Sequence, residues 1–212
     1  MFKKILFSLV VLLAIAVVVI AARPSAFAVE RSAEIDAPAD VVFGLVNDLH
    51  NWPGWSPWDK LDPEQTRTFE GAEAGKGASF SWKGNDKVGE GRMTIDDSRP
   101  NELVAMTLEF LKPWKSTSKV TFAFKGSEKT QIVWRMEGAY DFFGKAMSLF
   151  MDMDSMVGKD FEAGLGSLGQ LAKVTAEKRA AEEKARLQAE AEAAAAAAQE
   201  AAAAEEVAGA RE

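Results

Sequence analysis

Residues 103–137 read LVAMTLEFLKPWKSTSKVTFAFKGSEKTQIVWRME, and this stretch decides the fold. Apolar and polar side chains alternate in three runs, Leu103–Phe110, Ser118–Phe124 and Gln131–Glu137. A period of two is typical of strands with one buried face. The runs are separated by segments rich in Gly, Ser, Pro and Lys, which suit hairpin turns. The stretch therefore predicts three neighbouring strands of an antiparallel meander.

The same pattern continues towards the N-terminus. Four further segments have strand character, namely FAVERSAEI from Phe27, Thr66–Phe69, Ala78–Lys83 and Gly89–Ile95. Alternation places the large apolar residues of the meander on one face: Phe80, Trp82, Met93, Ile95, Val104, Met106, Leu108, Phe110, Val120, Phe122, Phe124, Ile132, Trp134 and Met136. The other face is mostly polar. We therefore expect a curved antiparallel sheet of about seven strands whose apolar face needs a cover.

Helical periodicity supplies that cover. A short helix is predicted at VVFGLVNDL, residues 41–49, and a long one from Gly144 to Leu171. The long helix carries a single apolar stripe, formed by Phe150, Met153, Val157, Phe161, Leu165 and Leu168. Its glycines disfavour a helix interior by about 1 kcal/mol each. Close helix–sheet contact or space for a ligand must compensate for them.

Both ends of the chain differ from this central part. Ile5–Ala22 is apolar except at Ser8 and would reach about 27 Å as a helix, which is enough to cross a bilayer. An uncleaved transmembrane anchor is the first interpretation, and a signal peptide cleaved near Ala26-Phe27-Ala28 is the alternative. In either case Lys3 and Lys4 favour a cytoplasmic N-terminus and an exported domain.

The C-terminal segment from Lys173 is dominated by alanine and glutamate, which are strong helix formers. It lacks an apolar heptad repeat, so a solvated single helix is expected, and association through alanines remains an alternative. We therefore divide the chain into an anchor or signal peptide at 1–24, a folded domain at 25–172 and a helical extension at 173–212.

Composition excludes several classes of site. The chain has no cysteine, one histidine and a formal charge of −7. Zinc fingers, iron–sulfur clusters, disulfides and thiol nucleophiles are excluded, and the acidic domain argues against binding of nucleic acid. No nucleophile motif, phosphate-binding loop or metal-ligand cluster is visible. We therefore expect no cofactor and no metal.

Five segments carry a resemblance to a known family. They are AEIDAP at Ala33–Pro38, VVFGLVNDLHNWPGWSPW at 41–58, GEGRMTI at Gly89–Ile95, LEFLKPW at Leu108–Trp114 and SLFMDMDSMVGKDFEAGL at Ser148–Leu165. In this order they resemble the SRPBCC, or START-like, superfamily and its bacterial polyketide cyclase/dehydrase-like branch. The resemblance implies an α+β helix-grip fold of order β-α-α-β6-α, with a deep apolar cavity between the sheet and the long helix.

Candidate ligand contacts are the residues expected to face that cavity: Trp55, Trp58, Phe80, Trp82, Met93, Met106, Leu108, Phe122, Trp134, Met153, Asp154, Val157 and Phe161. Core packing explains the apolar members equally well. Trp52, Trp55 and Trp58 either line a cavity mouth or membrane interface, or plug the end of the core. Asp154 is either a cavity carboxylate or a helix cap, and His50 is either catalytic or a surface residue.

These observations predict a membrane-anchored START-like domain that binds a hydrophobic small molecule or lipid. It would face the periplasmic side of a bacterial inner membrane. One alternative is a polyketide cyclase or dehydratase that uses His50 or Asp154 in the same cavity. Another is an envelope structural or interaction module whose alanine-rich helix is the working surface. No catalytic residue can be assigned, and the oligomeric state is not predicted.

Overall fold

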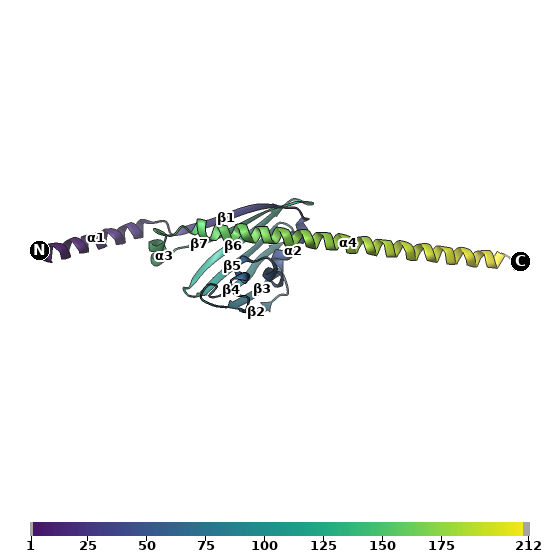
Figure 1. Cartoon of the computed structure of the whole chain (residues 1–212), viewed down its shortest axis with the longest axis horizontal. Helices are drawn as coiled ribbons and strands as arrows, with labels where there is room; N and C mark the ends of the chain where they lie inside the picture. Colours follow the sequence, from purple (N-terminus) through teal and green to yellow (C-terminus); the bar gives the residue numbers. More distant parts are fainter. Residues whose placement is uncertain (1, 210–212) are drawn as a thin grey trace. The chain divides into compact units, whose positions relative to one another are not determined.

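The computed structural model describes the fold of residues 2–209 and the side chains of residues 2–199. The chain forms two compact units, Met1–Ala172 and Lys173–Glu212, which are described separately. The first unit contains an α+β domain in which a seven-stranded antiparallel sheet is covered by a helix (Figure 1). The expected helix-grip architecture is therefore confirmed.

From the second strand to the seventh, each strand pairs with the next one in the sequence, and the first strand pairs with the seventh at one edge of the sheet. They are β1 (Ala26–Ile35), β2 (Thr66–Gly71), β3 (Ala78–Lys83), β4 (Glu90–Arg99), β5 (Leu103–Lys112), β6 (Ser116–Lys125) and β7 (Thr130–Ala139). Their order in the sheet is β1-β7-β6-β5-β4-β3-β2. The register pairs Phe80 with Met93 and Met93 with Leu108, so the large apolar side chains share one face as predicted. We call it the inner face.

Two 3₁₀ segments and three helices complete the domain. Between β1 and β2 lie α2 (Ala39–Asn47) and the 3₁₀ segments η1 (Leu49–Gly54) and η2 (Pro57–Lys60). After β7 come α3 (Phe142–Met147) and α4 (Met153–Gly209). Phe161, Leu165 and Leu168 of α4 are buried, and the ring of Phe161 stacks on that of Trp134 at 4.0 Å. The core therefore lies between α4 and the inner face.

The predicted helix from Gly144 to Leu171 is wrong at its start. The Asp141 side chain accepts a hydrogen bond from the Gly144 amide and caps α3, which ends at Met147. Asp152 then accepts bonds from the Asp154 amide and the Ser155 hydroxyl, which begins α4. Both carboxylates cap a new helix N-terminus. Phe150 lies between the two helices and is 85% exposed, so it does not belong to the buried stripe.

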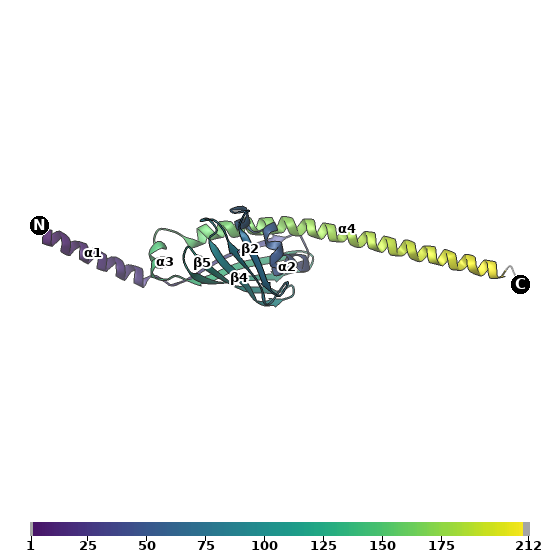
Figure 2. The same cartoon turned by 90° about the horizontal axis from the view of Figure 1, so that it is seen from below.

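The two ends of the sheet are covered differently. At one end, which we call the α2 end, α2 and its flanks bond to the β2–β3, β4–β5 and β6–β7 hairpins. The Ala39 amide donates to Ser127, the Gly75 amide donates to Asn47, and the Ser98 hydroxyl lies 2.6 Å from Oδ1 of Asn47. The other end, the α3 end, carries the β3–β4 and β5–β6 hairpins, α3 and the start of β1. Figure 2 shows α3 at this end and α2 towards the other.

A single apolar helix precedes the domain. Helix α1 (Phe2–Ala22) is, within residues 2–209, the one helix long and apolar enough to cross a membrane. None of its described residues is buried by the rest of the protein. Three residues separate its last residue, Ala22, from Ala26 at the start of β1.

The second unit is the helical continuation of α4. Its described side chains are almost all exposed, and its charges pair along the helix. Arg186 contacts Glu183 at 2.6 Å and Glu190 at 3.5 Å. Pairs three or four residues apart stabilise exposed helices by a few tenths of a kcal/mol, about 0.2–0.5 each. The last three residues of the predicted extension lie outside the described part of the chain.

Candidate ligand-binding site

Aromatic side chains fill the centre of the inner face. Trp55, Phe122, Trp134 and Phe161 are each at most 2% exposed. The ring centroids of Phe122 and Trp134 are 4.9 Å apart, and Trp55 meets Trp134 edge-on at 5.7 Å. Four of the predicted ligand contacts therefore form one packed aromatic cluster.

The tryptophan-rich segment packs into the core. The Trp52 indole donates to the carbonyl of Val46 at 3.0 Å, and the Trp55 indole donates to that of Leu45 at 3.2 Å. These bonds satisfy carbonyls at the end of α2, which the helix itself leaves without partners. Trp58 is half-buried, and its ring contacts those of Trp134 and Phe161. Trp52 and Trp55 thus pack as part of the core, whereas Trp58 keeps accessible surface.

Trp134 carries an unusual polar atom. Its indole nitrogen Nε1 is buried and has no hydrogen-bond partner, whereas Trp52, Trp55 and Trp82 all donate to main-chain oxygens. A buried donor without a partner costs about 1–3 kcal/mol. Within the part of the chain whose side chains are described, this indole is thus the one buried side-chain donor without a partner.

A second set of aromatic residues lies on the inner face near the free edge of the sheet. We call it the aromatic row; it comprises Phe69, Phe80, Trp82 and Phe110. Neighbouring centroids are 5.9, 5.6 and 5.8 Å apart along the row. Phe80, Trp82 and Phe110 are half-buried, and Phe69 is exposed. The row thus leaves apolar surface accessible beside a closed core.

Local sequence explains how the row is held. Trp82 lies against Gly91 of the neighbouring strand, where any side chain would collide with the indole ring. The Trp82 indole donates to the carbonyl of Val88 at 3.0 Å. Phe69 was not predicted as a site residue, because a four-residue strand at a sheet edge gives a weak signal. Phe110 appeared in the apolar alternation but was not selected from it.

A polar cluster lies beside the row and was missed by sequence reasoning. Arg67 pairs in register with Trp82, and its guanidinium contacts the carboxylate of Asp59 in η2. The Gln65 amide also donates to Asp59, at 3.2 Å. Both charged side chains are largely buried, at 21% and 13% exposed. Since the partners are eight residues apart on different elements, their spacing carries no signal.

Asp154 takes part in an ion-pair cluster that holds the start of α4 to β1. Arg31 contacts Asp154 at 2.9 Å and Glu162 at 2.8 Å. Its guanidinium lies against Gly158, where any side chain would collide with it. The hydrogen bonds from Arg31 hold the pKa of Asp154 below its usual value. Asp154 is 52% exposed, so it lies at the surface.

The single histidine lies in a different contact network. The His50 ring is 2.9 Å from the Asp48 carboxylate and stacks on Phe69 at 4.0 Å. Its side chain is about half exposed. Neither His50 nor Asp154 reaches the packed aromatic cluster through a contact that the structure shows.

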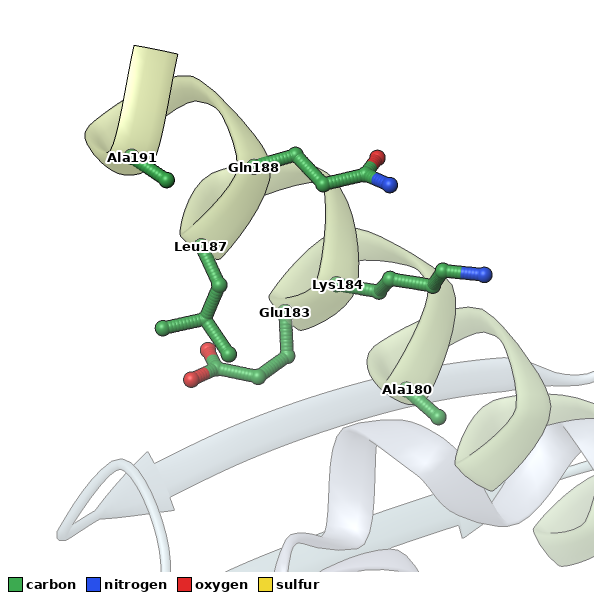
Figure 3. Close-up of a pocket in the computed structure, with 6 residues that line it drawn as sticks. All are labelled: Ala180, Glu183, Lys184, Leu187, Gln188 and Ala191. Atoms are coloured by element: carbon green, nitrogen blue, oxygen red, sulfur yellow. The ribbon is translucent and has the colours of Figure 1, made fainter. Parts of the chain in front are cut away.

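The remaining candidate ligand contacts differ in how deeply they are buried. Met93, Met106 and Leu108 are buried on the inner face, and Met153 and Val157 are half-buried in the first turns of α4. Among the described residues, no group of three or more His, Cys, Asp or Glu could hold a metal ion. A shallow hollow lies on the exposed helix of the second unit, between Ala180 and Ala191 (Figure 3). Because one helix forms it alone, it is not the expected interior site.

Solved structures share this fold. A protein from Mesorhizobium loti matches with a TM-score of 0.52 at 16% identity, covering 70% of this chain and 98% of its own. A protein from Chromobacterium violaceum matches with a TM-score of 0.51 at 13% identity, covering 68% and 96%. Truncated norcoclaurine synthase from Thalictrum flavum matches with a TM-score of 0.50 at 14% identity, covering 70% and 94%. At these identities the likeness concerns the fold alone.

By sequence, no curated protein matches the chain. A family model does match it, over residues 26–173, and is described as polyketide cyclase / dehydrase and lipid transport. This match spans the whole sheet, the aromatic cluster and the packed part of α4. The chain therefore belongs to the polyketide cyclase/dehydrase and lipid transport family of START-like proteins.

Proposed function

We propose that this protein is a membrane-anchored START-like domain that binds a hydrophobic small molecule or lipid on the inner face of its sheet, beside the packed core. The aromatic row is the observation that carries this proposal. Phe80, Trp82 and Phe110 lie on the same face as the buried core, yet each keeps accessible surface. Ligand sites are lined mostly by apolar and aromatic side chains with a few polar groups. The row supplies such a wall.

The ligand's polar group is constrained by Trp134. Its unpaired indole N–H favours a ligand that carries an acceptor oxygen, such as an ester carbonyl, a quinone oxygen or a carboxylic acid. Binding of that oxygen would satisfy the buried donor. The ligand therefore combines an apolar body, which contacts the row, with one acceptor oxygen near Trp134.

The membrane location rests on α1. Its 21 residues would extend about 31 Å, close to the hydrocarbon thickness of a bilayer. Lys3 and Lys4 at its start favour retention of the N-terminus in the cytoplasm, with the domain on the periplasmic side of a bacterial inner membrane. Cleavage of α1 as a signal peptide would place the domain in the same compartment.

Ligand titration of the full chain tests the proposal. The protein is purified in detergent, stripped of lipid and titrated with fatty acids, phospholipids and quinones. Native mass spectrometry and tryptophan fluorescence report binding. We expect at least one ligand with micromolar affinity, weakened by Trp82→Ala and unchanged by Leu187→Ala, which removes an exposed side chain of the second unit. Absence of any such ligand would contradict the proposal.

Neither alternative gains a specific observation. The enzyme hypothesis needs His50 or Asp154 in the interior beside a polar partner. Asp154 is 52% exposed and pairs with Arg31, and His50, which pairs with Asp48, is about half exposed and contacts the aromatic row only at its exposed member, Phe69. The interaction-module hypothesis assigns the function to the helix from Lys173 onwards, and it stays a prediction. Deletion of Lys173–Glu212 followed by comparison of co-purifying proteins would test it.

A further inference from the structure

Large apolar side chains are exposed together at the α3 end of the domain. Trp114 in the β5–β6 hairpin is 69% exposed, and Phe142 and Phe143 of α3 are each 54% exposed. Leu149, Phe150 and Met151 follow directly after α3 and are also exposed. The Trp114 and Phe143 rings lie 5.9 Å apart, which joins the hairpin to α3. We call these six residues the apolar rim.

Core packing cannot explain the rim, because its side chains contact solvent. Isolated exposed apolar residues are normal, but a contiguous group marks an interaction surface. Tryptophan and phenylalanine contribute the largest apolar areas among side chains. The rim therefore needs an occupant.

The contacts of helix α1 indicate what covers the rim. Its last turn contacts α3: the Lys145 ammonium lies 3.3 Å from the Ala21 carbonyl, and Arg23 donates to the Ser148 carbonyl at 2.9 Å. Both views place α3 beside the C-terminal end of α1, with α2 at the opposite end of the sheet (Figures 1 and 2). Where α1 crosses a bilayer, Ala22 marks the level at which the span ends. Helix α3 then lies at the membrane–water interface.

The link between α1 and the sheet is too short to hold the domain away from the bilayer that α1 would cross. Arg23, Pro24 and Ser25 separate the helix from β1, and three residues span at most about 11 Å. The Tyr140 amide also donates to the Ser25 carbonyl at 2.6 Å, which fixes the link to the end of β7. The α3 end must therefore face the bilayer.

The charges near the rim fit this orientation. Arg23, Lys115 and Lys145 flank it, while the acidic residues next to it, Asp141 and Asp152, accept hydrogen bonds as caps of α3 and α4. Exposed basic residues next to a span are attracted to anionic headgroups by about 1 kcal/mol each, so they favour an anionic surface. Tryptophan is also the aromatic residue enriched at membrane interfaces, which suits Trp114.

We infer that the apolar rim docks on the surface of the same phospholipid bilayer that α1 enters, and that it holds the α3 end of the domain against the headgroups. This inference rests on the proposed anchoring by α1. It adds a second contact with the membrane, made by α3 and the β5–β6 hairpin. The half-buried aromatic row reaches this same end of the sheet through Trp82 and Phe110.

Spin labelling tests the inference on the full chain. Because the sequence has no cysteine, a single introduced cysteine carries the label uniquely. Four variants are reconstituted in nanodiscs of phosphatidylethanolamine and phosphatidylglycerol: Phe143→Cys and Trp114→Cys on the rim, Ser127→Cys at the α2 end, and Leu12→Cys in α1. The ratio of collisions with oxygen to collisions with a water-soluble nickel complex measures the depth of each label.

We expect the two rim labels to show a ratio several times that of Ser127→Cys, and Leu12→Cys to show the highest ratio. Rim labels as exposed to nickel as Ser127→Cys, with Leu12→Cys still deep, would overturn the docking but leave the anchor intact. A shallow Leu12→Cys would remove the anchor and the docking together. Dipolar broadening between rim labels of two copies would assign the rim to a dimer instead of to lipid.

Discussion

The two ends of the sheet use aromatic residues in opposite ways. At the α2 end, Trp52 and Trp55 are buried, and their indole nitrogens donate to carbonyls of α2. At the α3 end, Trp114, Phe142 and Phe143 are exposed, although the domain buries aromatic rings of the same kinds elsewhere. Residue type is the same, so the difference lies in what covers each end.

That difference separates stability from function. A closed end has its donors satisfied and its rings packed, which stabilises one conformation. An open end leaves apolar surface that gains free energy only when something outside the domain covers it. The α2 end is thus the structural end of the grip, and the α3 end, with α1 beside it, is the end that meets its surroundings.

Truncation of one tryptophan at each end should give the largest contrast. We expect Trp55→Ala to lower the free energy of unfolding by about 3–5 kcal/mol, because it leaves a cavity and frees the Leu45 carbonyl. Trp114→Ala should change it by less than about 0.5 kcal/mol, since exposed substitutions rarely do more. Urea unfolding in detergent, followed by near-ultraviolet circular dichroism, measures both. Similar losses for the two variants would mean that the α3 end is also part of the core.

Two glycines of α4 offer a smaller contrast. Gly158→Ala places a methyl group against the Arg31 guanidinium, which must then leave Asp154 and Glu162, and we expect a net loss of stability because these lost contacts outweigh the helix preference of alanine. Gly166→Ala meets no atom within 4 Å and is exposed, so it should stabilise the helix by up to about 1 kcal/mol. The same urea unfolding applies. If both variants stabilise the protein, Arg31 does not hold α4 to β1.

The unpaired donor of Trp134 predicts a change in ligand selectivity. Trp134→Phe removes the N–H but keeps an aromatic ring in contact with Phe161. We expect it to weaken binding of a fatty acid methyl ester by about fivefold, equal to one hydrogen bond of about 1 kcal/mol, relative to an alkane of equal length. Competition binding with the two ligands measures the ratio. An equal change for ester and alkane would place the ester oxygen away from Trp134.

The sheet could be predicted from sequence because its signal is local. Alternation in Leu103–Phe110 and the following strands fixes which side chains share a face, and the observed register agrees. The break at Ser148–Asp152 could not be predicted in the same way. The apolar period of the expected helix continues through Phe150, while the capping carboxylates Asp141 and Asp152 interrupt the backbone.

The candidate site was predicted less completely than the fold. Hydrophobicity selects Trp134 and Phe122 as interior residues, but it cannot tell a packed cluster from a cavity wall, because both need apolar side chains. It also cannot distinguish the exposed Phe142 and Phe143 from core residues. Contacts such as Arg31 with Asp154, 123 residues apart, depend on the tertiary fold and leave no trace in local spacing.

Acid should loosen the α3 end before the α2 end, and this is the smallest effect that we expect. Hydrogen bonds from Arg31 lower the pKa of Asp154 in the folded protein. The stabilisation from this pair is therefore complete above the usual carboxyl pKa and is lost as pH falls through the lowered value. Because Asp154 is exposed, solvent screens the pair and the effect is local. The protection of the amides in residues 153–158 against hydrogen exchange, measured relative to that of α2, should fall only in acid. Arg31→Leu should show the lower protection already at neutral pH. If protection in this variant still falls only in acid, a group other than Asp154 causes the change.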